Sequence, residues 1–395
     1  MSGFALGSVI ALVVVVLLAL RLRSRAYAIF RGVQLALHTS IAVALAPHFA
    51  WAWPVFVYLH AVVYLQALVL VRPRLMPLWY RVLFSVPSAF FGAGTLLALP
   101  WAIVTAFGVT PWAPWLPYLV ALIGVIQSLT MREEQVDVVV ADGAVPGLRR
   151  HPRGTERVAR PLRVVQITDP HLGPFMSVER LRRIAESAVR RQPDLIVLTG
   201  DFLTMESQSD PRLLAEALAP LTALQGRVFA CFGNHDHEAP ETVRRALAGA
   251  GVRLLMDQAA MVETEAGTVQ ILGSDFVWRD RAEHLARLCA RHPRVTGALR
   301  LLLLHDPSAF THLPEGEADL VLSGHTHGGQ VGLVSLGLSW TMLRLFVKSP
   351  DHGLWARGRD RLYVHRGTGH YGFPLRIGVP AENSILLVHA PTLQP

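Results

Sequence analysis

The sequence predicts an all-α transmembrane region followed by a layered α/β domain. Long uncharged apolar runs are confined to the first third of the chain, and strands alternate with amphipathic helices after it. Of the 395 residues, 52% are hydrophobic and only 17% are charged, against roughly 25% charged residues in average soluble domains. The third observation is that five polar clusters each follow directly on an apolar run, which indicates a shared site.

Five apolar runs make up the region 1–131, and each is near the ~20 residues that cross a bilayer core. We therefore expect about five spans, of which the second and third are the least sharply separated. His38, His48 and His60 lie in or beside these runs and are expected to form hydrogen bonds between helices. The runs cover about Phe4–Leu20, Val33–Trp53, Pro54–Val71, Val82–Thr110 and Pro111–Thr130.

The arginines around these runs predict their orientation. They follow the first run instead of preceding it, which favours a retained anchor over a cleaved signal peptide. The loops 21–32 and 72–81 contain arginines, whereas the two other short loops contain no Lys or Arg. The positive-inside rule places the arginine-containing loops in the cytoplasm. With five spans the part after Met131 is cytoplasmic as well, and with one span more or fewer it lies on the other face.

Net charge and cysteine content restrict the partners. The net charge of +8 would suit nucleic acid. An arginine cluster directly after the last apolar run would instead bind anionic lipid head groups. Each arginine near the membrane surface would contribute ~1 kcal/mol to the binding free energy. We therefore expect a membrane surface, and not nucleic acid, as the partner. Two cysteines, Cys231 and Cys289, exclude a disulfide framework and a thiolate metal site. The cluster consists of Arg149, Arg150, Arg153, Arg157 and Arg160.

The remaining chain divides into a strand with its connector, 132–162, and an α/β domain, 163–395. We expect a strand at Gln135–Ala141 and a turn-rich connector at Asp142–Pro161. Strands are expected at Arg163–Thr168, Asp194–Thr199, Arg227–Phe232, Val252–Glu263, Thr268–Gly273, Leu301–Leu304 and Asp319–Leu322. Helices are expected at Val178–Gln192, Pro211–Leu224, Glu241–Ala250 and Arg279–His292.

Five polar clusters follow predicted strands. In layered α/β folds ligands bind beyond the carboxyl ends of the strands, so the clusters would converge on one crevice. Their imidazoles, carboxylates and amide are too many for one four-coordinate ion and suit two divalent cations ~3.5–4 Å apart. Mixed N/O donors without cysteine favour Mn, Fe or Zn over Ca. The clusters are Asp169-Pro170-His171, Gly200-Asp201, Gly233-Asn234-His235-Asp236, His305-Asp306 and Gly324-His325-Thr326-His327.

Taken singly, these residues have simpler explanations. Asp201 and Asn234 could be turn residues after strands, because Asx side chains favour turns. His305 could be a core histidine. All five clusters in order, however, resemble the pattern of the calcineurin-like metallophosphoesterase superfamily, which reads Asp-x-His, Gly-Asp, Gly-Asn-His-Asp/Glu, a lone His and Gly-His-x-His. Pro170 departs from the apolar residue usual there, which removes a backbone N–H but no ligand.

The resemblance covers about Val164 to His389. The tail is similar to the branch of bacterial membrane-associated phosphoesterases of the YkuE or YaeI type. The resemblance implies a four-layer β-sandwich flanked by helices. The apolar runs lie outside the resemblance, and from them we expect a protein integral to the membrane, here a bacterial cell membrane. The residues that carry the second resemblance are Gly328-Gly329-Gln330, Gly353-Leu354-Trp355 and Tyr363-Val364-His365-Arg366-Gly367-Thr368-Gly369.

The resemblance also implies roles for the residues. Asp201 would bridge two ions with a hydroxide between them as the nucleophile. His235 would be the general acid, and Asp236 would orient its ring. Arg366 would contact either the substrate phosphate or an acidic side chain. One ion would be held by Asp169, His171, Asp201 and His327, and the other by Asp201, Asn234, His305 and His325.

Three hypotheses for function follow. The first is a membrane-anchored metal-dependent phosphohydrolase that cleaves a phosphoester or pyrophosphate, with a lipid-linked substrate as one candidate. The second is a phosphodiesterase for soluble nucleotides or nucleic acid, tethered by its spans. The third is a non-enzymatic membrane module. The apolar segment Val331–Lys348 is either a packed strand and helix or a lip that contacts lipid. The sequence defines neither the substrate nor the oligomeric state.

Overall fold

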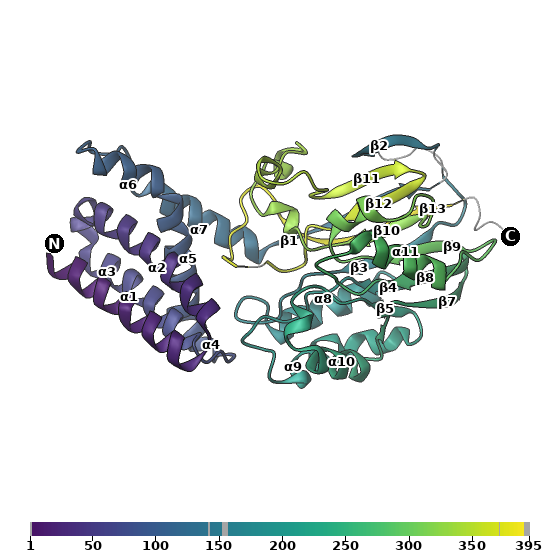
Figure 1. The fold of residues 1–395 in the computed structure, drawn as a ribbon, viewed down its shortest axis with the longest axis horizontal. Coiled ribbons are helices and arrows are strands. Elements are labelled where there is room, and N and C mark those ends of the chain that lie inside the picture. The colour runs from purple at the N-terminus through teal and green to yellow at the C-terminus, as the bar shows by residue number, and fades with distance from the viewer. Residues whose placement is uncertain (1, 141–142, 152–156, 371, 391–395) are drawn as a thin grey trace. The chain divides into compact units, whose positions relative to one another are not determined.

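The computed structural model describes residues 2–140, 143–151, 157–370 and 372–390. The chain forms two compact units (Figure 1). The helical unit contains Met1–Leu129 together with the short segment Gly372–Ile377. The sheet unit contains Thr130–Tyr371 and Gly378–Pro395. Arg153 of the predicted arginine cluster lies outside the described residues.

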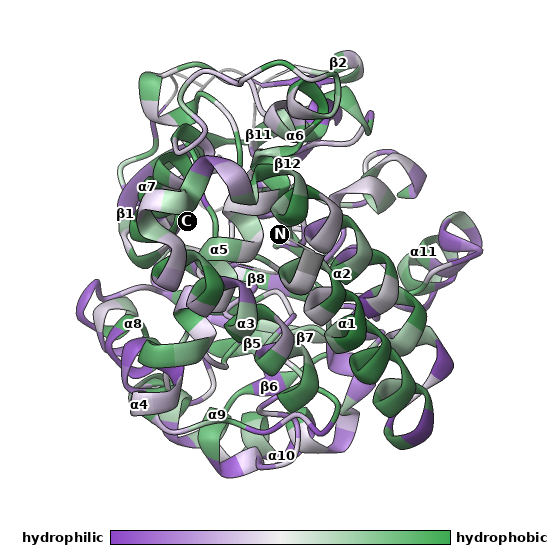
Figure 2. Ribbon diagram, turned by 90° about the vertical axis from the view of Figure 1, so that its left-hand side faces the viewer, coloured by the Kyte–Doolittle hydropathy of each residue, from purple (hydrophilic) through white to green (hydrophobic). Residues whose placement is uncertain are grey.

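The helical unit is built from apolar helices, and Figure 2 shows the hydrophobic colour running along α1 and α2. Ser24 separates these two helices, since its side chain accepts a hydrogen bond from the Tyr27 amide and caps α2. The helices are α1 (Ser2–Leu22), α2 (Arg25–Leu45), α3 (Trp53–Val69), α4 (Leu78–Tyr80), α5 (Val86–Leu97), α6 (Leu99–Ala106) and α7 (Leu116–Leu129).

Two helices in the described part of the chain are long and apolar enough to cross a membrane, Gly3–Leu22 and Arg25–Val69. A bent pair, Leu78–Leu97 with Leu99–Ala106, would add a third if it forms one span. The helix Arg25–Val69 combines α2, the 3-10 helix Ala46–Ala52 and α3. Its 45 residues are more than twice the ~20 that one crossing needs. The expectation of about five spans stays a prediction.

Buried polar side chains join the helices inside this unit. His38 Nε2 lies 3.2 Å from His60 Nδ1, and His60 Nε2 lies 2.8 Å from Ser8 Oγ. His48 Nε2 lies 3.5 Å from Thr105 Oγ1. These histidines form hydrogen bonds between helices, as the sequence predicted.

The sheet unit contains two mixed sheets. One has the order β1-β13-β3-β4-β5-β6 and the other the order β2-β11-β12-β10-β9-β8-β7. The strands of the first are β1 (Met131–Val139), β13 (Ala381–His389), β3 (Leu162–Ile167), β4 (Leu195–Leu198), β5 (Val228–Ala230) and β6 (Arg253–Leu254). Those of the second are β2 (Val145–Arg150), β11 (Gly353–Gly358), β12 (Asp360–Val364), β10 (Leu320–Ser323), β9 (Leu299–Leu303), β8 (Gly267–Gly273) and β7 (Gln258–Thr264).

Alternation along the strands divides the core into layers, because successive side chains of a strand point to opposite faces. Val165 of β3 packs in the cluster that contains Ile184 of α8, whereas its neighbour Val164 packs between the sheets with Leu301 of β9. On the far face of the second sheet, Leu302 packs with Leu285 of α11. This helix–sheet–sheet–helix arrangement confirms the predicted fold class.

All four predicted helices of the sheet unit are present. Figure 1 shows α8, α9 and α10 together along one side of this unit. Side chains cap two of them: Ser177 accepts from the Arg180 amide at the start of α8, and Asp210 accepts from the Arg212 amide at the start of α9. The helices are α8 (Val178–Arg190), α9 (Pro211–Leu218), α10 (Pro240–Gly249) and α11 (Arg281–Arg291).

The predicted connector was wrong in one respect, because it contains β2. This strand pairs only with β11 at the edge of its sheet, a position where Pro146 and charged side chains are tolerated. The predicted strand Val252–Glu263 is two strands, β6 and β7, in different sheets. The C-terminal strands β11, β12 and β13 were not predicted.

Candidate active site

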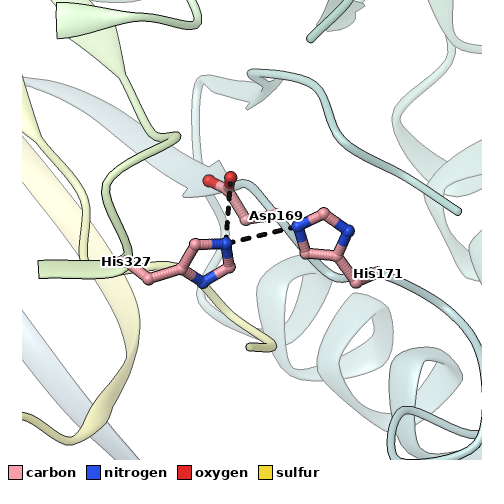
Figure 3. A group of neighbouring side chains, drawn as sticks. All are labelled: Asp169, His171 and His327. Atoms are coloured by element: carbon pink, nitrogen blue, oxygen red, sulfur yellow. Dashed lines mark hydrogen bonds and ion pairs between the residues drawn. The ribbon is translucent and has the colours of Figure 1, made fainter. Parts of the chain in front are cut away.

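The carboxyl ends of five strands bring the predicted clusters together. Strands β3, β4 and β5 run parallel in one sheet, and β9 and β10 run parallel in the other. Two groups of potential metal ligands result, and within each the ligand atoms lie within 4.8 Å of one another. The first group is Asp169, His171 and His327 (Figure 3), and the second is Asp201, His305 and His325.

In the first group the side chains point at a common position. His171 Nε2 lies 3.2 Å from His327 Nε2, and His327 Nε2 lies 3.5 Å from Asp169 Oδ1. The Asp169 carboxylate is fixed by the Thr168 hydroxyl at 2.7 Å and by the His325 amide at 3.0 Å. All three members of the group are buried.

In the second group His305 Nε2 lies 3.2 Å from His325 Nδ1 and 3.3 Å from Asp201 Oδ2. His305 donates its Nδ1–H to the Thr199 carbonyl at 2.6 Å. This hydrogen bond directs Nε2 toward the other ligands, as is usual for metal-binding histidines.

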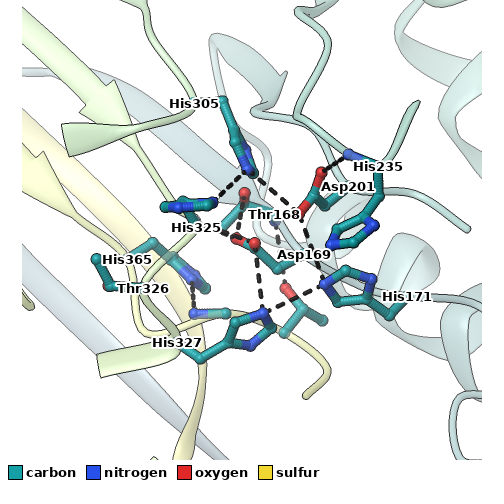
Figure 4. Close-up of polar contacts among 12 residues, drawn as sticks. Thr168, Asp169, His171, Asp201, His235, His305, His325, Thr326, His327 and His365 are labelled. Atoms are coloured by element: carbon teal, nitrogen blue, oxygen red, sulfur yellow. Dashed lines mark hydrogen bonds and ion pairs between the residues drawn. The ribbon is translucent and has the colours of Figure 1, made fainter. Parts of the chain in front are cut away.

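Asp201 lies between the two groups (Figure 4). Its Oδ2 is 3.3 Å from His305 Nε2 in one group and 3.7 Å from His171 Nε2 in the other. Its Oδ1 accepts the His235 amide at 2.9 Å. One carboxylate oxygen therefore faces both groups, as a bridging ligand would.

Burial and mutual charge shift the pKa values of these side chains. Burial lowers the pKa of both His171 and His325 to about 4, which favours the neutral ring that binds metals. Burial alone would raise the pKa of Asp201, but His305 and His171 hold it below its usual range. Burial alone would lower the pKa of His305, but Asp201 raises it to about 10. The paired charges of Asp201 and His305 thus compensate each other inside the site.

The backbone is strained where it presents the ligands. Positive φ angles occur at Asp169 (51°), His171 (44°), Asp201 (58°), His325 (67°) and His327 (50°). Each such residue costs of order 1–3 kcal/mol. Ten described non-glycine residues have a positive φ, so half of them are predicted ligands. Strain concentrated in this way is typical of functional sites.

Glycines allow the loops to approach one another. A Cβ at Gly233 would lie 2.2 Å from Asp201 Oδ1, and one at Gly324 would lie 2.1 Å from Asp169 Oδ2. Both carboxylates are buried and held by hydrogen bonds. These two positions therefore require glycine for packing, whatever the local φ.

Replacing Gly324 with alanine should displace Asp169 from His327. We expect the amount of bound metal, measured by mass spectrometry, to fall well below that of the unaltered protein. Gly249→Ala is the control, since its new Cβ would be 3.6 Å from Ala215 Cβ in ordinary contact. Full metal content in Gly324→Ala would contradict the packing argument.

Asn234 provides the test of whether this site fits a cation. Its Oδ1 is buried and accepts no hydrogen bond within the described part of the chain. An amide oxygen without a donor is costly to bury, but a metal ion would satisfy it. The donor set of imidazoles, carboxylates and this amide therefore fits two divalent ions, and six of the seven predicted ligands fall into the two groups.

Asp236 has a different role from the one predicted. Its carboxylate accepts the backbone amides of Asp201 at 2.7 Å, Phe202 at 2.9 Å and Gly233 at 2.7 Å. The ring of His235 instead has Glu238 as a partner, with Nδ1 2.8 Å from Oε1. The prediction that Asp236 orients His235 is wrong, because the Asp236 carboxylate joins the loop after β4 to the loop after β5 through these backbone amides.

The sequence allowed two partners for Arg366, a substrate phosphate or an acidic side chain. In the structure Arg366 forms ion pairs with two acidic side chains. Its Nη2 lies 2.5 Å from Glu134 Oε1 and its Nε lies 3.4 Å from Glu382 Oε2. Burial alone would lower the pKa of Arg366, but these two carboxylates raise it. Arg366 therefore joins the segment that follows β12 to β1 and β13.

Replacing Arg366 with methionine should destabilise the fold, because it removes the guanidinium that pairs with buried Glu382 and with Glu134. The expected loss in the free energy of unfolding is about 3–5 kcal/mol, measured by urea titration in detergent. Arg132→Met is the control. Arg132 also pairs with Glu134, at 3.6 Å, but is 58% exposed, so its loss should cost at most ~1 kcal/mol. Equal effects of the two changes would contradict the assignment.

A cleft beside the second group was not predicted from the sequence. Its lining includes Phe276, Arg281 and His305. Phe276 lies 6.2 Å, ring to ring, from His305 and 4.7 Å from Trp278, which is 72% exposed. Arg281 closes one side through an ion pair of 2.9 Å with Asp306. No motif marked Phe276 and Trp278, which lie in the loop between β8 and α11.

The fold and the site together define a metal-dependent phosphoesterase. Residues 162–329 match the family model for calcineurin-like phosphoesterases. The chain is 29% identical over 234 residues to phosphodiesterase YaeI of Escherichia coli, covering 58% of this chain and 82% of that protein. It is 30% identical over 235 residues to the uncharacterized metallophosphoesterase YkoQ of Bacillus subtilis, covering 56% and 81%.

A third relative is a transmembrane protein with a metallophosphoesterase domain from Danio rerio. It is 32% identical over 238 residues, which cover 56% of this chain and 52% of that protein. The chain belongs to the calcineurin-like metallophosphoesterase family, as the sequence motifs predicted.

Proposed function

We propose that this chain is a membrane-anchored dimetal phosphohydrolase that cleaves a phosphoester or pyrophosphate. The observation that carries the proposal is the position of Asp201 Oδ2, 3.3 Å from His305 and 3.7 Å from His171. When bound, two divalent ions would lower the pKa of water and stabilise charge on the phosphoryl oxygens.

The seven predicted ligands divide into two sets that share Asp201. One set comprises Asp169, His171, Asp201 and His327, and the other comprises Asp201, Asn234, His305 and His325. Neutral imidazoles with carboxylates suit Mn, Fe or Zn. Among these we propose manganese for the first test, since oxygen donors are well represented.

His235 is proposed as the proton donor to the leaving oxygen. Its ring lies 5.6 Å, centroid to centroid, from that of His171, and its Nδ1 contacts Glu238. Burial alone would lower the pKa of His235, but the hydrogen bond with Glu238 and the charge of Asp201 raise it. These two contacts favour the protonated ring, in which Nε2 can donate.

The proposal is tested with purified full-length protein in detergent. Elemental analysis should find about two divalent ions per chain, and added Mn should support hydrolysis of methyl p-nitrophenyl phosphate. The proposal fails if no phosphate ester is hydrolysed with any of the three metals.

A soluble nucleotide or nucleic acid is the second candidate for the substrate. The observation that favours it is the aromatic pair Phe276 and Trp278 beside His305, on which a base could stack. A non-enzymatic module is not favoured, because both ligand groups are assembled. Competition by nucleotides against the chromogenic diester would identify the second candidate.

The sheet unit is proposed to lie in the cytoplasm. The loops with Arg21, Arg23, Arg72 and Arg74 support this orientation through the positive-inside rule. A thiol placed in the loop 72–81 should react with a membrane-impermeant reagent only after the cells are opened. Labelling of this thiol in intact cells would place the loop 72–81 outside the cytoplasm and contradict the proposed orientation.

A further inference from the structure

The segment Val331–Val347, here called the lip, exposes eight large apolar side chains. Monomeric soluble proteins rarely expose such contiguous apolar surface unless it meets a partner or a membrane. The exposed side chains are Leu333 (38%), Leu336 (73%), Leu338 (54%), Trp340 (40%), Met342 (40%), Leu345 (66%), Phe346 (76%) and Val347 (43%).

The backbone of the lip is held in place by hydrogen bonds. The amide of Leu333 donates to the Trp340 carbonyl at 2.9 Å, and the amide of Met342 donates to the Val331 carbonyl at 2.8 Å. Buried Thr341 donates its hydroxyl to Asp351 at 2.6 Å. The apolar side chains are therefore displayed on a fixed frame.

The lip adjoins the metal-binding loop. It begins after Gln330, three residues beyond His327. Leu343 packs against the same loop, since a Cβ at Gly329 would lie 2.7 Å from Leu343 Cβ. Whatever covers the lip is thus held next to the ligands of the first group.

The charges of the lip indicate its partner. No Asp or Glu occurs between Val331 and Lys348, whereas Arg344 and Lys348 are both exposed. Exposed apolar side chains with flanking cations are the composition of segments that enter the interface of an anionic bilayer.

The course of the chain supports the same partner. Gly378 forms a bridge with Val331 and accepts the Ser335 amide at 2.8 Å. Its neighbour Ile377 ends the segment Gly372–Ile377, which belongs to the helical unit. Within that unit Leu375 packs with Ala93 and Ala121. One peptide bond therefore separates the residue paired with the lip from a segment packed among apolar helices.

We propose that the lip inserts into the lipid interface and that the enzyme takes its phosphoester from the bilayer. This inference rests on the proposed phosphohydrolase function and adds the substrate class, a phosphate ester carried by a lipid. The lip would hold the hydrocarbon-bearing end of the substrate in the membrane, beside the ions that act on its phosphate.

A matched pair of substrates tests the proposal. Hexadecyl p-nitrophenyl phosphate in phosphatidylglycerol nanodiscs and soluble methyl p-nitrophenyl phosphate share the reacting group and the leaving group. Full-length protein in the same nanodiscs is compared with the variant Leu336→Ser/Leu345→Ser/Phe346→Ser. We expect kcat/KM for the hexadecyl ester to fall at least about tenfold, and that for the methyl ester to change by less than about twofold.

The outcomes separate this inference from the proposed function. No hydrolysis of either ester by the unaltered protein, nor of a phosphomonoester or a pyrophosphate, with any of the three metals would overturn the function itself. Hydrolysis of both with equal effects of the variant on the two esters, or no effect on either, would overturn the lipid inference alone. Met261→Ser/Val295→Ser is the control, since Met261 (46%) and Val295 (43%) are exposed apolar side chains outside the lip.

A direct measurement of insertion completes the test. Both native cysteines are buried, so a thiol introduced by Phe346→Cys can be labelled selectively with an environment-sensitive dye. Its fluorescence should shift to the blue and be quenched by nitroxide lipids in the nanodiscs, whereas a label at Met261→Cys should not respond. An unquenched label at position 346 would mean that the lip is covered by protein or by solvent, and would overturn the proposal.

Discussion

Replacing Asp201 with asparagine is expected to reduce kcat/KM for phosphodiesters by at least about 10³-fold, or ~4 kcal/mol, and to deplete both bound ions. The reason is that a single oxygen, Asp201 Oδ2, faces His305 at 3.3 Å and His171 at 3.7 Å. An amide has the same shape but lacks the charge that two cations share. The remaining Oδ1 can still accept the His235 amide, so the loop should keep its conformation.

The measurements are steady-state hydrolysis with added Mn and metal content by mass spectrometry. Asp210→Asn is the matched control, since Asp210 caps α9 through the Arg212 amide and lies outside both ligand groups. Its activity and metal content should equal those of the unaltered protein. Retention of two ions by Asp201→Asn would contradict the assignment of Asp201 as the bridging ligand.

The second large effect is expected at His235, and it should depend on the leaving group. Replacing His235 with glutamine should slow hydrolysis of an alkyl ester by about 10²–10⁴-fold, the usual contribution of a general acid. With p-nitrophenol as the leaving group the loss should be below about tenfold, because this phenolate departs without a proton. Parallel measurement of kcat for the two esters gives the ratio.

Glu238 should influence the rate through the pKa of His235, without donating a proton to the leaving group itself. Its carboxylate contacts His235 Nδ1 at 2.8 Å but is 48% exposed, so Glu238→Gln should cost about tenfold or less and lower the pKa of His235. The observable result is a basic limb of the pH profile that moves to lower pH. Equal losses for both leaving groups in His235→Gln would mean that His235 only positions the loop.

The clusters that form the site could be predicted from the sequence because each directly follows a buried strand. Leu195–Leu198 and Leu320–Ser323 are apolar runs that end just before Gly200-Asp201 and Gly324-His325. Parallel strands bring their carboxyl ends to one edge, so local pattern was sufficient to predict the convergence.

The partner of His235 could not be predicted in this way. Asp236 is adjacent in sequence, but it accepts three backbone amides beneath the loops, and this depends on how two different strand ends meet. Glu238 reaches the ring because a short turn follows His235, with the Glu238 amide donating to the His235 carbonyl. Hydrogen bonds of the backbone, which side-chain patterns do not encode, decided between the two carboxylates.

Long-range strand pairing was also beyond the sequence pattern. The strand β13 pairs with β1 in parallel from Met131 with Ala381 to Val139 with His389, across most of the sheet unit's length. The edge strand β2 contains Pro146, Gly147 and two arginines, which read locally as a connector. Its pairing with β11 is determined by the tertiary fold and not by strand propensity.

The return of the chain to the helical unit at Gly372–Ile377 has a practical consequence for truncation. The peptide backbone joins the two units at three places, before Thr130, before Gly372 and after Ile377, so cutting any single connection would leave them covalently linked. A fragment beginning at Thr130 would retain Leu375 and Ile377 but lose Ala93 and Gly124, which they contact. Such a fragment would expose the apolar side chains of Leu375 and Ile377 to water and should self-associate. Production of a soluble fragment should therefore begin by replacing these two side chains with polar ones.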